Sequence, residues 1–98
     1  MKYQRDANHG KILQGLIDAG FSVFDASRCG YGVSDLIVTK PGTVNVWFIE
    51  VKRPGPPSAR KLNANEEAFR TVFPLNYYVV QDVEEALVAM GVRREAAA

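Results

Sequence analysis

The chain has little of the chemistry that disulfide scaffolds and zinc sites require. Its 98 residues include only 1 cysteine, Cys29, and 1 histidine, His9. A lone cysteine cannot form an internal disulfide, and one cysteine with one histidine cannot supply the ligand set of a structural zinc site. Any metal that this chain binds for catalysis is therefore expected to have oxygen ligands.

Long hydrophobic runs and an excess of one charge are also absent. No apolar run approaches the roughly 18 residues of a membrane span, and the start of the chain, with Lys2, Arg5 and Asp6, lacks a secretory apolar segment. We therefore expect a cytoplasmic protein. Lys and Arg total 12 and Asp and Glu total 11, for a formal net charge of +1. This balance excludes a polybasic chain that binds nucleic acid indiscriminately, so nucleic-acid binding would need basic groups gathered locally.

The length and the overall composition of the chain fit one soluble globular domain. The chain is 47% hydrophobic and 23% charged, which is ordinary for such a domain and unlike a disordered or coiled-coil chain. We expect a single domain over residues 1–92, followed by a frayed tail over 93–98.

Hydrophobic periodicity and turn signals predict an α/β fold with the element order αβββαβα. The strand at 45–52 is the longest and most apolar, so we expect it to be central and buried on both faces. The segment 53–61 has three prolines and one glycine and is predicted to be an irregular loop. The helices are expected at 7–19, 63–73 and 82–90, and the strands at 21–26, 35–40, 45–52 and 77–80. The expected caps are Asp6 or Asn8, then Asn63 with Glu66, then Asp82 with Glu85.

The turn at residues 41–44 predicts the register of the hairpin on either side of it. If the turn is centred between Gly42 and Thr43, Asp35 lies directly across from Glu50. Lys52 lies two residues beyond Glu50, so its ammonium is expected on the same face. Like charges directly opposite each other destabilise a sheet unless something lies between them. We interpret the pair as a site for a divalent cation.

Carboxylates, water and substrate phosphate are the ligands that Mg²⁺ and Mn²⁺ prefer, and the carbonyl of Val51 is a further candidate. A lysine beside such a cation can orient or deprotonate water, or offset charge that builds up on a phosphate. The pattern therefore favours metal-assisted hydrolysis of a phosphodiester. The alternative is a structural salt bridge between Lys52 and one acid, which leaves the second acid poorly explained.

These residues also resemble a known family. Gly32-Val33-Ser34-Asp35 followed by Ile49-Glu50-Val51-Lys52, in the order αβββαβα, is similar to the PD-(D/E)XK nuclease superfamily. Within that superfamily the chain resembles the small stand-alone VRR-NUC domains encoded largely by phages and bacteria. The similarity covers nearly the whole chain, from residues 5–8 to residues 83–87.

The resemblance implies a restriction-endonuclease-like core with a mixed four-stranded sheet flanked by helices. It implies a Mg²⁺- or Mn²⁺-dependent endodeoxyribonuclease that acts as a homodimer on branched DNA such as four-way (Holliday) junctions, in a bacterial or phage-infected cell. On this interpretation Asp35 and Glu50 bind the metal and Lys52 is the catalytic lysine.

Three positions depart from the family pattern. His9 occupies the place of a glutamate that often reaches the site from the first helix, so it is a tentative metal ligand, a proton-transfer group, a DNA contact or a residue without a role. Ser34 replaces a common proline, which should matter little. Glu66 replaces a common glutamine of the second helix, and either supports the metal site or only caps its helix.

The candidates for DNA contact lie in the loops that flank the predicted site: Arg28, Gly30, Gly32, Arg53, Arg60 and Lys61. The two glycines would let the backbone approach a phosphate, or simply permit a turn. Tyr31 stacks on an unpaired base or covers its loop, and we favour cover. Nothing resembles a base-reading helix, so recognition of the DNA backbone and shape is expected.

Phe73, Tyr77 and Tyr78 are candidates for a dimer interface, with core packing the commoner explanation for each. Two further functions stay open: a DNA-binding or assembly protein with a degraded site on the same fold, and, less well supported, a small-molecule phosphatase. The second is weaker because the loops are too short to enclose a ligand well.

Overall fold

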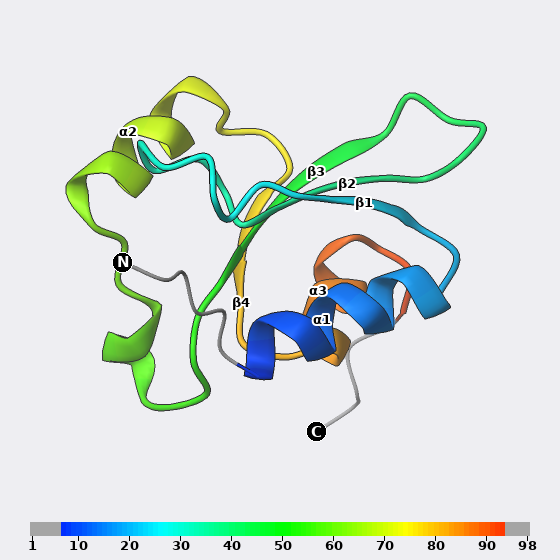
Figure 1. The fold of residues 1–98 in the computed structure, drawn as a ribbon, viewed down its shortest axis with the longest axis horizontal. Coiled ribbons are helices and arrows are strands. Elements are labelled where there is room, and N and C mark those ends of the chain that lie inside the picture. Colours follow the sequence, from blue (N-terminus) through cyan, green and yellow to red (C-terminus); the bar gives the residue numbers. More distant parts are fainter. Residues whose placement is uncertain (1–6, 94–98) are drawn as a thin grey trace.

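The computed structural model describes residues 7–93 and has the expected element order (Figure 1). The elements are α1 (Ala7–Asp18), β1 (Ser22–Asp25), β2 (Leu36–Thr39), β3 (Val46–Val51), the 3₁₀ helix η1 (Pro57–Arg60), α2 (Ala64–Val72), β4 (Tyr77–Val80) and α3 (Val83–Ala89). The strands form a sheet in the order β1-β2-β3-β4, in which β3 pairs with β2 antiparallel and with β4 parallel. The α/β class and the mixed four-stranded sheet are thus confirmed. Of the predicted tail, residues 94–98 lie outside the described part, and so does the proposed cap Asp6.

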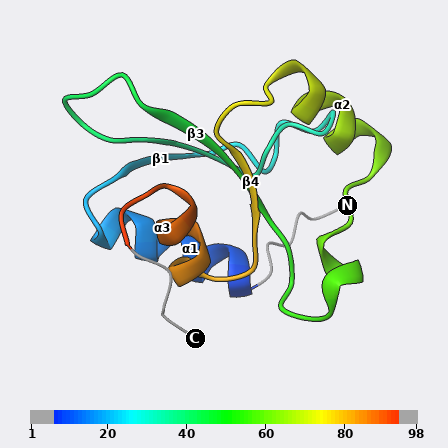
Figure 2. The same cartoon turned by 180° about the vertical axis from the view of Figure 1, so that it is seen from behind.

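Helices α1 and α3 pack together on one side of the sheet, and α2 lies on the other side (Figures 1 and 2). The helical spacing of Ile12 and Leu16 directs both side chains of α1 into the core. Burying a side chain of this size contributes about 1.5–3 kcal/mol each. Val23 of β1 packs against this core at its edge. The other buried members come from the residue before β1, from β2, β3 and β4, and from α3 and its C-cap: Phe21, Leu36, Val38, Trp47, Ile49, Val80, Ala86, Leu87 and Met90.

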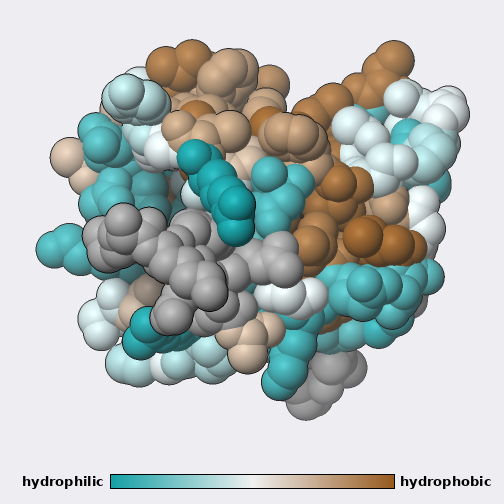
Figure 3. Space-filling view, in the orientation of Figure 1, coloured by the Kyte–Doolittle hydropathy of each residue, from teal (hydrophilic) through white to brown (hydrophobic). Residues whose placement is uncertain are grey.

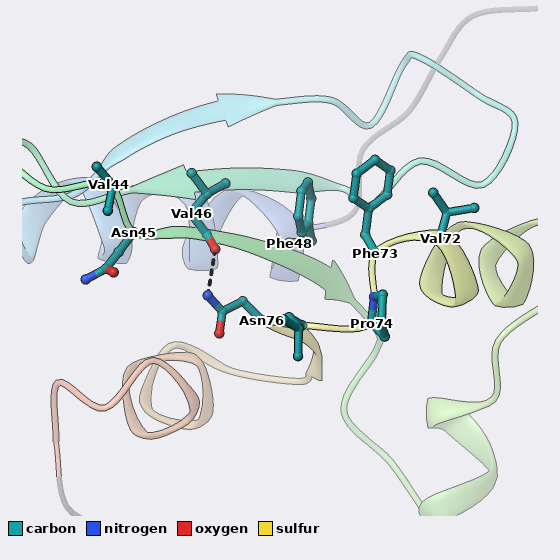
Figure 4. Close-up of a pocket in the computed structure, with 9 residues that line it drawn as sticks. Val44, Asn45, Val46, Phe48, Val72, Phe73, Pro74 and Asn76 are labelled. Atoms are coloured by element: carbon teal, nitrogen blue, oxygen red, sulfur yellow. Dashed lines mark hydrogen bonds between the residues drawn. The ribbon is translucent and has the colours of Figure 1, made fainter.

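The opposite face is covered only in part, by the C-terminal half of α2. The ring of Phe48 lies 5.5 Å from that of Phe69 and 5.0 Å from that of Phe73, centre to centre. Strand β3 is central, as expected, but the expectation that both of its faces are buried is wrong. Val46 is exposed and Phe48 is only half-buried, because α2 is short and covers one end of the strand. Figure 4 shows this open face, with Val46 and Phe48 beside Phe73.

Two local predictions fail for physical reasons. The segment 53–61 contains the single turn η1, because a proline at the start of a helix has no N–H that needs a partner, and Ala59 N donates to Pro56 O at 2.8 Å. Asn8 lies inside α1 and does not cap it. Its side chain instead donates to the carbonyls of Lys52 and Gln81.

The other caps form at their expected positions. Asn63 and Glu66 make the complete capping box of α2. Asp82 caps α3 by accepting from Glu85 N at 2.7 Å, whereas the Glu85 carboxylate accepts from Gln81 N, one residue before the cap. Among the described residues, no helix is both long and apolar enough to cross a membrane.

The hairpin has the predicted register. Leu36 pairs with Ile49 and Val38 pairs with Trp47. One further step along this ladder places Asp35 across from Glu50, at the end of the hairpin that faces α2.

Candidate active site

The backbone around Asp35 holds its carboxylate toward β3. Ala26 N donates to Asp35 O at 2.8 Å, and Asp35 Oδ2 accepts from Val51 N at 2.8 Å. The first bond continues the ladder between β1 and β2, and the second is a bond to the Asp35 side chain that fixes it beside the residue that follows Glu50. The predicted pairing of the two acids is therefore present in the fold.

Glu50 is a buried acid that lacks a full set of partners. Its side chain belongs to a residue only 3% exposed, and its Oε1 atom is buried without a hydrogen-bond partner. Burial first, and then the charge of Asp35, raise the pKa of Glu50 from an ordinary value of 4.5 to about 9. A carboxylate in this position therefore needs a compensating positive charge.

The Lys52 ammonium supplies part of that charge. Its Nζ lies 3.7 Å from Glu50 Oε2 and donates to Glu66 Oε1 at 2.9 Å. Burial acts to lower the pKa of Lys52, but the hydrogen bond and charge of Glu66, together with Glu50 and Asp35, outweigh it and hold the pKa above its ordinary value. The expected convergence of two acids and one lysine is confirmed.

Glu66 has both of the contacts that its two interpretations require. It completes the capping box of α2 with Asn63, and it also binds Lys52. Burial acts to raise the pKa of Glu66, but the hydrogen bonds from the Asn63 backbone and from Lys52 lower it overall. The sequence alone gave no sign of the bond to Lys52, because β3 and α2 meet only in three dimensions.

The donors around Glu50 fit a hard divalent cation. Within residues 7–93, no group of three or more His, Cys, Asp or Glu side chains is placed to hold a metal ion. The side chains that would hold a cation here are the two carboxylates of Asp35 and Glu50, and water and a backbone carbonyl such as that of Val51 would have to complete its ligands, as water commonly does for Mg²⁺. The unpartnered Oε1 atom of Glu50 fits such a ligand. The role of the Val51 carbonyl stays a prediction.

His9 has a described partner other than the acid pair. It is buried, and its Nε2 lies 3.2 Å from Asp25 Oδ1, which also accepts from Ser27 Oγ at 2.6 Å. Asp25 pairs with Leu36, so it points to the face that α1 covers, whereas Glu50 shares the other face with Phe48. This contact gives no support to His9 as a metal ligand, and its role stays a prediction.

The glycine-rich loop serves a close approach between two parts of the backbone. Gly30, Tyr31 and Gly32 have positive φ angles of 73°, 58° and 79°. A Cβ atom on Gly32 would lie 2.2 Å from the carbonyl carbon of Asn65, in the first turn of α2. The positive φ of Gly32 and its close approach to Asn65 support the interpretation that this glycine permits a turn. Tyr31 is 91% exposed, so the expectation that it covers its loop is wrong.

The basic residues proposed for DNA contact fall into two groups. Arg28, Arg53 and Lys61 are exposed. Arg60 instead donates to Glu85 Oε2 at 2.6 Å and to Val79 O at 3.2 Å. Arg60 is therefore engaged in fixing η1 against β4 and α3, whereas the other three are exposed to solvent.

Sequence reasoning missed two residues that support the end of β3. Asn8 Nδ2 donates to Lys52 O and to Gln81 O, at 2.9 Å in each case, and Gln81 Nε2 donates to Arg53 O at 2.8 Å. Together they hold the backbone that carries Lys52 against β4 and α1. The partners are distant in sequence, so no local signal could have identified them.

Comparisons with protein families, with curated proteins and with solved structures found no match to this chain.

Proposed function

We propose that this protein is a Mg²⁺- or Mn²⁺-dependent endodeoxyribonuclease with a restriction-endonuclease-like core of the PD-(D/E)XK type. Its proposed substrate is branched DNA, such as a four-way junction. One observation carries the proposal: Glu50 is buried with an unpartnered oxygen, across from Asp35 and 3.7 Å from the Lys52 ammonium. Two acids that can bind a cation, with one lysine beside them, suit metal-assisted phosphodiester hydrolysis.

Each residue has a distinct part in this proposal. Asp35 and Glu50 bind the cation, which when bound supplies a Lewis acid that polarises a phosphoryl oxygen and makes water more acidic. Lys52 offsets the negative charge that builds up on the phosphate, and Glu66 holds the lysine in place through their 2.9 Å contact. The bond from Val51 N keeps the Asp35 carboxylate oriented toward the site.

DNA binding is assigned to the exposed cations Arg28, Arg53 and Lys61, which lie in the loops before β2 and after β3. Contacts of this kind neutralise phosphates and carry no base information, which suits recognition of backbone shape.

We also propose that the active form is a homodimer. Of the residues first considered for the interface, Tyr77 is buried and Tyr78 is half-buried against the core, so only Phe73 remains a candidate. It lies with other exposed apolar side chains around the end of α2 and the neighbouring strand: Val44, Val46, Val72 and Leu75. Figure 3 shows hydrophobic surface over α2 and beside it. Two-fold symmetry would present two sites to one branched DNA.

The experiment that tests this function is cleavage of linear, flapped, single-stranded and four-way DNA in Mg²⁺, in Mn²⁺ and in a chelator. The wild-type protein should cut four-way DNA only with metal. Asp35→Ala, Glu50→Ala and Lys52→Ala should each abolish cutting with circular dichroism unchanged. Lys40→Ala is the matched control, because Lys40 is exposed in the hairpin turn. Cutting by folded Lys52→Ala at the wild-type rate contradicts the role of the lysine.

The alternative is a DNA-binding or assembly protein without catalytic activity on the same fold. Two observations favour it: His9 contacts Asp25, and within residues 7–93 no group of three or more potential ligand side chains is found. This alternative expects DNA binding that weakens as salt increases, with no hydrolysis in either metal and no site-specific Mn²⁺ binding in a calorimetric titration.

A further inference from the structure

Two buried side-chain polar atoms in the described part of the chain lack a hydrogen-bond partner, and they belong to residues on the neighbouring strands β3 and β4. They are Glu50 Oε1 and the Tyr77 hydroxyl oxygen. Buried polar groups are nearly always hydrogen-bonded in folded proteins, so an unpartnered one requires an explanation.

Strand register places the two residues as neighbours. Phe48 pairs with Tyr77 and Glu50 pairs with Val79 across the parallel strands β3 and β4. Tyr77 and Glu50 are therefore diagonal neighbours on the face that α2 covers, at a spacing that long and aromatic side chains can bridge.

The surroundings of the Tyr77 ring hold it in that position. The residue is 9% exposed, and its ring lies 6.0 Å from the ring of Phe69 on α2, centre to centre. Burial, and then the charges of Glu50, Glu66 and Asp35, raise the pKa of Tyr77. The hydroxyl therefore keeps its proton, and the negative charges of these carboxylates act on it.

The rings around Tyr77 belong to phenylalanines, so the packing of this cluster does not explain the Tyr77 hydroxyl. Phe48, Phe69 and Phe73 pack against one another without any polar atom, and Tyr77 joins this cluster through Phe69. A phenylalanine at residue 77 would fill the same space without burying an unpartnered oxygen. The oxygen is explained if it serves the acidic site next to it.

We propose that Tyr77 is a positioning residue of the metal site, whose hydroxyl donates a hydrogen bond to the Glu50 carboxylate when a divalent cation is bound. This inference rests on the proposed function. The bond would hold Glu50 in the orientation in which it binds the cation, as groups that hydrogen-bond metal ligands commonly do.

The test is Tyr77→Phe in the full chain, with Tyr78→Phe as the matched control. Tyr78 is half-buried and packs against the core on the other face of the sheet. Two quantities are measured: the Mn²⁺ dissociation constant by calorimetry, and the unfolding midpoint without metal. Tyr77→Phe should weaken Mn²⁺ binding about ten-fold and leave the midpoint unchanged or higher, because only a hydroxyl is removed. Tyr78→Phe should bind Mn²⁺ with wild-type affinity.

A second readout uses the absorbance of the tyrosines. Adding Mn²⁺ to the wild-type protein should change the ultraviolet spectrum of tyrosine, and this change should be lost in Tyr77→Phe and kept in Tyr78→Phe. Wild-type Mn²⁺ affinity in Tyr77→Phe overturns the role of Tyr77 and leaves the proposed nuclease intact. Absence of Mn²⁺ binding by the wild-type protein overturns both.

Discussion

At the scale of single residues, the charged form of Glu50 is disfavoured by burial in the absence of a cation. Its pKa is raised to about 9, from an ordinary value of 4.5, by burial and by the charge of Asp35. Between these two values the folded protein holds a proton that the unfolded chain has released. The free energy of unfolding should therefore decrease as the pH rises through this window.

Glu50→Gln tests this consequence at the residue scale. The amide does not ionise, so in a chelator the variant should lose much less stability than the wild-type protein between about pH 5 and pH 9, and should be more stable near pH 8 by about 1–3 kcal/mol. Urea unfolding across that range measures the difference. Glu67→Gln is the control, because Glu67 is exposed and pairs with Arg70. A wild-type protein whose stability rises over this range contradicts the assignment.

At the scale of elements, the glycine loop and the first turn of α2 depend on each other. Gly32 approaches the backbone of Asn65, and the same turn of the helix carries Glu66, which holds Lys52. A change in this loop should therefore disturb both the fold and the position of the lysine.

Gly32→Ala tests the close approach. Its new Cβ atom would lie 2.2 Å from the Asn65 backbone at a φ angle of 79°, so we expect a loss of about 2–4 kcal/mol in the free energy of unfolding. Gly30→Ala is the matched control. Gly30 also has a positive φ, 73°, but an added Cβ would meet nothing within 4 Å, so about 1 kcal/mol is expected. Equal losses in the two variants would rule out the contact as the cause.

Local sequence patterns predicted the features of the elements that depend on residues close in sequence. The turn around Gly42 gave the register that brings Asp35 across from Glu50, and the capping box of α2 was readable from Asn63 and Glu66, because both depend on residues close in sequence. The sequence did not predict three other features: the exposure of Val46, the partner of Arg60, and the contact of His9 with Asp25. Each depends on where a distant helix or strand packs, which no periodicity records.

At the scale of the whole molecule, the sheet is closed on one face and open on part of the other. The face under α1 and α3 carries the core, while Leu75, which follows α2, is 82% exposed and lies beside Val46 and Phe73 on the open face. An apolar surface of this kind favours association with another surface.

Leu75→Glu tests the proposed homodimer. The wild-type protein should sediment as a dimer at micromolar concentration, and the variant should sediment as a monomer with its circular dichroism unchanged, because the side chain makes little contact within the chain. Ile17→Glu is the control, since Ile17 is exposed on α1, away from this face. A wild-type protein that stays monomeric at all concentrations contradicts the dimer but not the metal site.

The central claim is that the acids facing each other at the end of the hairpin bind a divalent cation beside Lys52. The most direct measurement is the anomalous diffraction signal of manganese in a crystal of the wild-type protein soaked in Mn²⁺. The account predicts one strong peak about 2.2 Å from carboxylate oxygens of both Asp35 and Glu50. A crystal that takes up manganese elsewhere and shows no peak between these two carboxylates would contradict it.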